Sequence, residues 1–141
     1  MKVSYFDIRD IESNIPNVQK VSFETLLKDS DFISIHCDLN KTSKYMFSNN
    51  EFNLMKEDSI LINTARGSII KEEHLIIALD EKKIGGACLD VFEEEPLSDD
   101  SPLKKFENVY LSPHNSNASP TVFRKVHLKS IENIFIGLGI S

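Results

Sequence analysis

Five short apolar runs, separated by polar segments and turn residues, define the architecture that is open to this chain. They cover residues 3–6, 32–36, 60–62, 87–89 and 109–111. Each is the length of a strand, and each is apolar almost throughout rather than alternating with polar residues. This pattern is typical of parallel strands covered by helices on both faces. The sequence therefore predicts a sheet that is buried on both sides.

Helical patterns fill the intervals between these runs. They are expected over residues 23–28, 50–55 and 72–80, and in the last of them Leu75, Ile76 and Leu79 share one face. Strands that alternate with helices at this spacing form right-handed βαβ units. The predicted fold class is α/β, with a Rossmann-like open parallel sheet and flanking helices.

A longer amphipathic helix is expected at the end of the chain. Ser119 followed by Pro120 is a preferred pair for the N-cap and first turn of a helix. Apolar residues then recur at helical spacing until Gly137 and Gly139, where we expect the helix to stop.

Composition excludes several classes of protein. A length of 141 residues suits one domain, and a net charge of -6 gives no excess of basic residues for binding nucleic acid or an anionic membrane. The two cysteines, Cys37 and Cys88, imply no disulfide framework, and the first residues do not form a signal peptide. We expect a cytoplasmic protein without a metal site.

A motif directly after the third apolar run has the properties of a ligand site. Asn63-Thr64-Ala65-Arg66-Gly67 stands at the carboxyl end of an expected strand, where open α/β sheets bind their ligands. The planar guanidinium of Arg66 matches a carboxylate or a 2-oxo acid. Taken alone, Arg66 would more often be a loop arginine paired to one of the 22 acidic residues, and its position after the strand reverses that preference.

Two further motifs follow in order, 89–96 (LDVFEEEP) and 112–114 (SPH), and with 63–67 they resemble D-2-hydroxyacid dehydrogenases over essentially the whole chain. The resemblance implies that Arg66 binds and polarises the substrate, that His114 is the catalytic histidine, and that Glu95 is its acid partner. Without it, His114 would be a polar residue ending a strand, and charge would not distinguish Glu95 from Glu93 and Glu94.

The chemistry of 2-oxo acid reduction agrees with these assignments. The cofactor supplies a hydride, and the carbonyl oxygen takes a proton from a group that titrates near neutral pH, as histidine does. A carboxylate such as Glu95 on the other ring nitrogen fixes the tautomer of His114. Arg66 stabilises the negative charge that grows on oxygen.

The family likeness also implies contacts with NAD. Asp90 would lie near the nicotinamide carboxamide, Asp7 at the adenosine ribose, His36 and Cys37 near the adenine, and Thr64 also at the cofactor. Asp7 could instead cap a turn, and His36 could be a buried histidine bonded to the backbone. Asp7 would repel a 2′-phosphate, which favours NAD over NADP, although Arg9 stands close by in sequence.

The chain departs from the family in three places. No glycine precedes Gly67, so we expect the first strand and the glycine-rich loop that binds the pyrophosphate to be absent, leaving an incomplete fold. Asp38 stands where the family commonly has proline, and Asn115 begins a stretch where an apolar residue and glycines are common. We expect a partial dinucleotide-binding domain over residues 1–118 and a C-terminal helix over 119–141.

The expected function is that of an oxidoreductase, or a fragment of one, which transfers a hydride between NAD(H) and a small-molecule D-2-hydroxy or 2-oxo acid. The isolated chain is expected to be weakly active or inactive. Two alternatives are an NAD(H)-responsive binding module resembling the corepressors of the family, and a non-catalytic product of a split or decayed gene. The unpaired strand edge favours a homo-oligomer.

Overall fold

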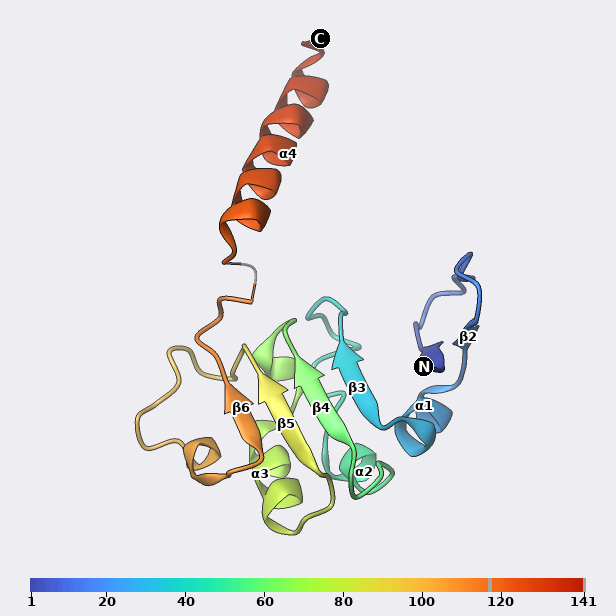
Figure 1. Ribbon diagram of the computed structural model, residues 1–141, viewed down its shortest axis with the longest axis vertical. Coiled ribbons are helices and arrows are strands. Elements are labelled where there is room, and N and C mark those ends of the chain that lie inside the picture. The colour runs from blue at the N-terminus through green and yellow to red at the C-terminus, as the bar shows by residue number, and fades with distance from the viewer. Residues whose placement is uncertain (117, 141) are drawn as a thin grey trace.

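The computed structural model describes residues 1–116 and 118–140, which form an α/β fold (Figure 1). The strands are β1 (Val3–Tyr5), β2 (Val18–Lys20), β3 (Phe32–Ile35), β4 (Ile60–Asn63), β5 (Gly86–Leu89) and β6 (Val109–Leu111). The α-helices are α1 (Phe23–Asp29), α2 (Asn49–Phe52), α3 (Glu72–Asp80) and α4 (Pro120–Leu138), with short 3₁₀ helices η1 (Gly67–Ile69) and η2 (Pro102–Lys105). All five expected strands are present within a residue or two of the predicted bounds.

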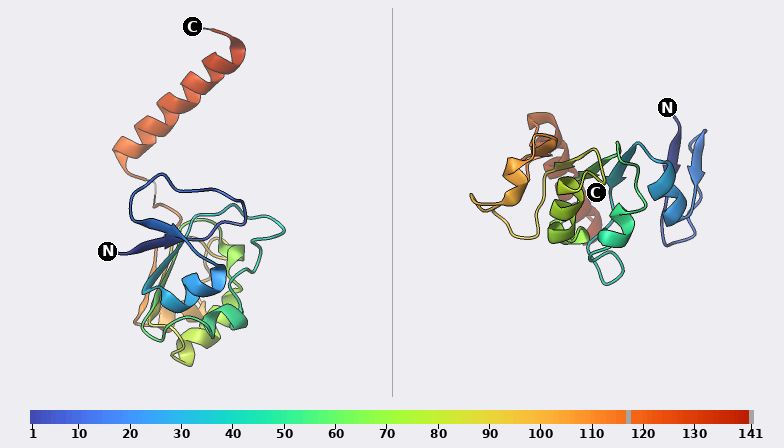
Figure 2. Two further views of the ribbon diagram at one scale, coloured as in Figure 1. Left: turned by 90° about the vertical axis from the view of Figure 1, so that its right-hand side faces the viewer. Right: turned by 90° about the horizontal axis from the view of Figure 1, so that it is seen from below.

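The strands form two parallel sheets. One contains four strands in the order β3-β4-β5-β6, and the other pairs β1 with β2. In the four-stranded sheet each strand pairs with its neighbour in sequence, so every connection is a crossover, with α2 and α3 in the first two and the 3₁₀ helix η2 in the third. The parallel Rossmann-like sheet is thereby confirmed, with β1 and β2 lying beyond the free edge of β3 (Figures 1 and 2).

The core lies on one face of the four-stranded sheet. Side chains from β3, β4 and β5 pack there against α2 and α3, as in the cluster of Ile33, Ile35, Leu61, Ala87, Phe52, Leu75 and Leu79. On the opposite face Phe32 is 68% exposed and Tyr110 is 73% exposed. The expectation of a sheet buried on both faces was therefore wrong for residues 1–116 and 118–140, because α2 and α3 pack against one face and side chains on the other face are exposed.

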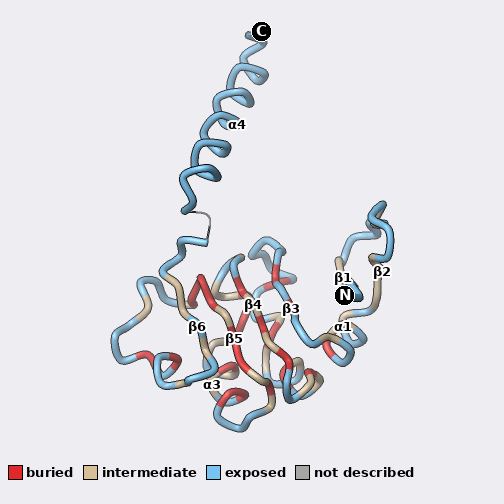
Figure 3. The backbone as a smooth tube through the Cα atoms, in the orientation of Figure 1, coloured by how far each residue is buried: buried red, intermediate tan, exposed pale blue. Residues whose placement is uncertain are grey.

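Helix α4 begins and ends as the sequence predicts. The Ser119 hydroxyl accepts a hydrogen bond from the backbone N–H of Val122 at 3.1 Å, and Gly139 has a left-handed φ of 67° that suits a residue without Cβ. Gly137 lies inside the helix rather than at its end. The helix extends away from the sheet and buries none of its residues (Figures 1 and 3).

Three elements were not predicted, namely β2, η1 and η2. Strand β2 consists of Val-Gln-Lys and pairs with β1 through Val3 and Val18, so its one apolar residue gave too little signal. Helix α2 is shorter than the interval 50–55 predicted for it. Over the described ranges 1–116 and 118–140, no helix is both long and apolar enough to span a membrane.

Candidate functional site

The candidate site lies where four strands end at the same edge of the sheet. Because β3 to β6 are parallel, the segments that follow them meet at this edge. These segments are 36–39 after β3, 64–67 after β4, 90–96 after β5 and 112–116 after β6. The three predicted catalytic residues all belong to these segments.

Asn63, the last residue of β4, shapes the loop that holds Arg66. It is fully buried, its amide nitrogen donates to the carbonyl of Arg66 at 3.0 Å, and its amide oxygen accepts from the N–H of Ala65 at 3.0 Å. Gly67 follows, and a Cβ there would lie 1.8 Å from the carbonyl oxygen of Phe92. The motif 63–67 thus packs directly against the segment after β5. Sequence analysis quoted Asn63 but assigned it no role.

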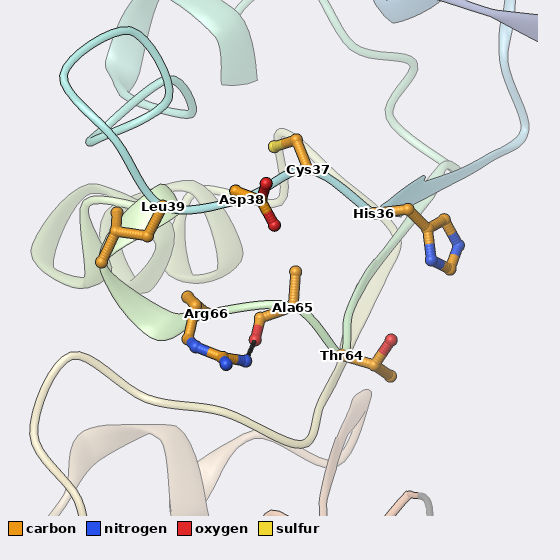
Figure 4. Close-up of a pocket in the computed structure, with 7 residues that line it drawn as sticks. All are labelled: His36, Cys37, Asp38, Leu39, Thr64, Ala65 and Arg66. Atoms are coloured by element: carbon orange, nitrogen blue, oxygen red, sulfur yellow. Dashed lines mark hydrogen bonds between the residues drawn. The ribbon is translucent and has the colours of Figure 1, made fainter. Parts of the chain in front are cut away.

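A pocket of about 410 Å³ opens between the segments after β3 and β4. Figure 4 shows the two segments running side by side, with the Arg66 guanidinium Nη1 donating to the carbonyl of Ala65 at 2.6 Å. The pocket is lined by His36, Cys37, Asp38, Leu39, Thr64, Ala65 and Arg66. It therefore brings Arg66 together with three of the five predicted cofactor residues.

His114 and Glu95 form a hydrogen-bonded pair after the neighbouring strands β6 and β5. The Nδ1 of His114 lies 2.8 Å from Oε2 of Glu95, and Oε1 of Glu95 accepts the N–H of Phe92 at 3.0 Å. These hydrogen bonds, that of His114 first, lower the pKa of Glu95 below its usual value, and the charge of Arg66 adds to the effect. An ionised carboxylate only accepts, so Nδ1 of His114 carries the proton and Nε2 is left for another partner.

The neighbouring Glu93 turns to a different partner. The N–H of Glu72 donates to the Glu93 carboxylate at 3.1 Å, and the N–H of Glu93 donates to the Glu72 carboxylate at 3.2 Å. This reciprocal contact fixes the segment after β5 to the start of α3. Glu93 and Glu95 thus have different partners, Glu72 and His114, although their charges alone did not distinguish them.

Asp90, the first residue after β5, is 2% exposed and surrounded by donors. Its carboxylate accepts the hydroxyl of Ser112 at 2.6 Å and the N–H groups of Asn115 and Ser116, each at 2.9 Å. Burial would raise the pKa of Asp90, but these hydrogen bonds outweigh it and lower the pKa to about 2. The predicted cofactor residue thus contacts the loop of His114.

The remaining predicted cofactor residues lie around the ends of β1 and β3. Both carboxylate oxygens of Asp7 are engaged by Arg9, through its N–H at 2.8 Å and its guanidinium at 3.2 and 3.3 Å. His36 Nε2 contacts the Ser34 hydroxyl at 2.8 Å. Burial raises the pKa of the Cys37 thiol, and the charges of Asp38 and Asp7 add to this.

Comparison with known families agrees with this arrangement. Residues 1–116 match the model of the D-isomer specific 2-hydroxyacid dehydrogenase NAD binding domain. The chain belongs to this family. It is also similar to the glyoxylate reductase of Thermofilum pendens, with 44% identity over 122 residues, which cover 84% of the chain and 36% of that enzyme.

Two solved structures superpose on nearly the whole chain. The D-lactate dehydrogenase of Lactobacillus jensenii with NAD⁺ has a TM-score of 0.85 and 30% identity, and the match covers 99% of this chain and 46% of that enzyme's chain. An acyclic imino acid reductase in complex with NADPH and D-Arg has a TM-score of 0.88 and 33% identity, and covers 99% and 44% respectively. The dehydrogenase domain described here therefore spans less than half the length of these relatives.

Proposed function

We propose that this chain provides the proton donor and much of the cofactor site of a D-2-hydroxyacid dehydrogenase, which interconverts a 2-oxo acid and a D-2-hydroxy acid with NAD(H). The observation that supports this most directly is the His114–Glu95 hydrogen bond of 2.8 Å. Arg66, Glu95 and His114 follow the adjacent parallel strands β4, β5 and β6, so a proton donor and a cation share one edge of the sheet. These are the two groups that carbonyl reduction needs from the protein.

The three residues divide the work as follows. Arg66 binds the carboxylate or carbonyl of the 2-oxo acid and stabilises the charge that develops on oxygen. His114 delivers the proton from Nε2, since its Nδ1 is directed at Glu95. Glu95 is kept ionised by its own hydrogen bonds and holds the imidazole in one orientation. In the oxidative direction the same groups run in reverse, with Nε2 accepting the hydroxyl proton.

The described residues suit one part of a nicotinamide dinucleotide better than another. The Asp7 carboxylate can accept hydrogen bonds from a ribose diol once Arg9 releases it. Thr64, His36 and Cys37 line the pocket at the carboxyl ends of β3 and β4. No glycine precedes Gly67 to form a pyrophosphate loop within these 141 residues. When bound, the cofactor supplies the hydride. Asp7 favours NAD, although one of the similar solved structures is an NADPH complex.

We therefore expect little or no turnover by the isolated chain. We also expect a homo-oligomer in solution, because an unpaired strand edge favours association. The dinucleotide-binding part is assigned to residues 1–118 and the C-terminal helix to 119–141. A small-molecule 2-oxo or 2-hydroxy acid is the expected substrate, since Arg66 is suited to such a carboxylate.

A chimeric enzyme tests this function without requiring the isolated chain to turn over. The matching segment of the Thermofilum pendens glyoxylate reductase is replaced by the homologous residues of this chain, which cover 122 positions. The chimera should oxidise NADH with a panel of 2-oxo acids, and His114→Ala should lower kcat by about 10²–10⁴-fold. A folded chimera that binds NADH but reduces no 2-oxo acid would overturn the proposal.

The second candidate is a binding module whose protein contacts respond to NAD(H). Its support is helix α4, which presents Phe123, Ile134 and Ile136 at 58% exposure or more. This function predicts association that changes with NADH and persists in His114→Ala. Sedimentation with and without NADH distinguishes it, since a catalytic module would show no such response.

A further inference from the structure

Asp90, expected near the nicotinamide, is a buried carboxylate that takes no part in the proposed proton transfer. Arg66, Glu95 and His114 account for substrate binding, orientation and proton transfer without it. Burying a carboxylate is costly unless it is well hydrogen-bonded, and Asp90 is only 2% exposed. Its partners therefore indicate what its charge does in this fold.

The three donors to Asp90 stand on both sides of His114 in the chain. Ser112 donates its hydroxyl to Oδ1 from before the histidine, and the N–H groups of Asn115 and Ser116 donate to Oδ1 and Oδ2 from after it. The N–H of Ser112 also donates to the carbonyl of Leu89 at 2.9 Å. The segment 112–116 is thus fastened to the end of β5 on both sides of His114.

His114 itself has a backbone conformation that needs such support. Its φ is +53°, in the left-handed region that residues with a Cβ adopt at a cost of roughly 1 kcal/mol or more. The residue is also half exposed, so little packing of its own side chain holds it in place. Among the described residues, the hydrogen bonds from Ser112, Asn115 and Ser116 to Asp90 hold the backbone on both sides of His114.

The same short segment also orients the ring. Asp90 grips the backbone around His114, and Glu95, five residues later, accepts from its Nδ1. Glu95 is in turn fixed by the N–H of Phe92. We infer that Asp90 is a positioning residue, whose buried carboxylate sets the backbone of the His114 loop so that the imidazole meets Glu95 with Nε2 directed outward.

This inference rests on the proposed function for its catalytic meaning, but its test requires no turnover. The isotope-labelled chain is studied by NMR as wild type, Asp90→Asn and Ser112→Ala. Asp99→Asn serves as the matched control, because it makes the same chemical change at an exposed acid that precedes η2 and pairs with Lys104. The readouts are amide exchange at Asn115 and Ser116 and the tautomer of the His114 ring from its nitrogen shifts.

In Asp90→Asn an amide NH₂ group replaces one acceptor oxygen, so at least one donor of the loop loses its partner. We expect exchange at Asn115 and Ser116 to become about 10-fold faster or more, and the His114 ring to change from the Nδ1-protonated tautomer to a mixture. Asp99→Asn should match wild type in both readouts. Ser112→Ala keeps the carboxylate and should shift both readouts in the same direction by a smaller factor.

Two results would overturn the inference. One is a folded Asp90→Asn chain whose ring tautomer equals that of Asp99→Asn, which would leave Asp90 with a purely structural role. The other result applies if Asp90→Asn does not fold. In that case a folded Ser112→Ala chain whose His114 tautomer equals that of wild type would overturn the inference. A change in the ring alongside an inactive chimera would refute the proposed function while retaining Asp90 as the residue that positions His114.

Discussion

The four-stranded sheet and helix α4 both contain regularly spaced apolar residues, yet only the sheet buries them. Leu61 at the centre of β4 has no exposed surface, whereas Ile131 in the middle of α4 is 48% exposed. The sheet gains the free energy of removing apolar surface from water, and α4 depends on its own caps and backbone hydrogen bonds. Apolar periodicity thus identifies an element, while its contribution to stability depends on what covers it.

The largest effect is expected from a methyl group at Gly67. In Gly67→Ala the new Cβ would collide with the backbone of Phe92, which cannot move aside as a flexible side chain can. We expect a loss of ~3 kcal/mol or more, enough to prevent folding. Gly137→Ala in α4 is the matched control, with no atom within 4 Å of the new Cβ. It should stabilise the helix by ~0.5–1 kcal/mol, measured by circular dichroism.

Truncation of Leu61 comes next. Leu61→Ala creates a cavity in the core and should lower the free energy of unfolding by ~2–5 kcal/mol in urea titrations. Ile131→Ala removes a similar side chain from α4 and should change it by less than ~1 kcal/mol. Equal losses at the two positions would mean that α4 is buried in solution, against a partner or a second copy of the chain.

A pH dependence of stability should be traceable to Asp90. Its pKa in the folded chain is about 2, below the usual 3.8, so its contribution is present above about pH 4 and is lost as the pH falls toward 2. The contribution is ~2 kcal/mol from a shift of this size. Urea titrations of wild type should show this loss, and Asp90→Asn should remove it. Curves for the two proteins that fall in parallel would contradict the prediction.

The smallest effect is expected at the N-cap of α4. Ser119→Ala removes the acceptor for the N–H of Val122 and should cost the helix ~1 kcal/mol. Because α4 buries no residue, the helical signal should fall while the unfolding midpoint of the sheet stays the same. A shift of that midpoint would show that helix and sheet unfold together.

The sequence predicted most of the elements because their signals are local. Apolar runs gave β3 to β6, and the Ser119-Pro120 pair gave the start of α4. Strand β2 was missed because its residues Val18, Gln19 and Lys20 become a strand only by pairing with β1. The open face of the sheet was also missed, since an apolar run is the same whether one or both of its faces are covered.

The candidate site shows the same limit more sharply. The residue types and order of the motifs indicated Arg66, Glu95 and His114, but not which atoms meet. The donors to Asp90 lie more than twenty residues further along the chain, so no local pattern connects them to it. Asn63 was missed for the opposite reason, because its bonds to Ala65 and Arg66 are local but become necessary only once it is buried.

The strand order of the larger sheet has a consequence for how quickly this chain folds. Partners such as Phe32 and Ile60, or Ile60 and Gly86, belong to strands that are neighbours in sequence, so each pairing closes a loop of a single crossover. The entropy lost is similar at each closure, and the sheet can grow one crossover at a time from any adjacent pair of strands. Assembly of β3 to β6 should therefore show single-exponential kinetics whose rate is unchanged when α4 is removed.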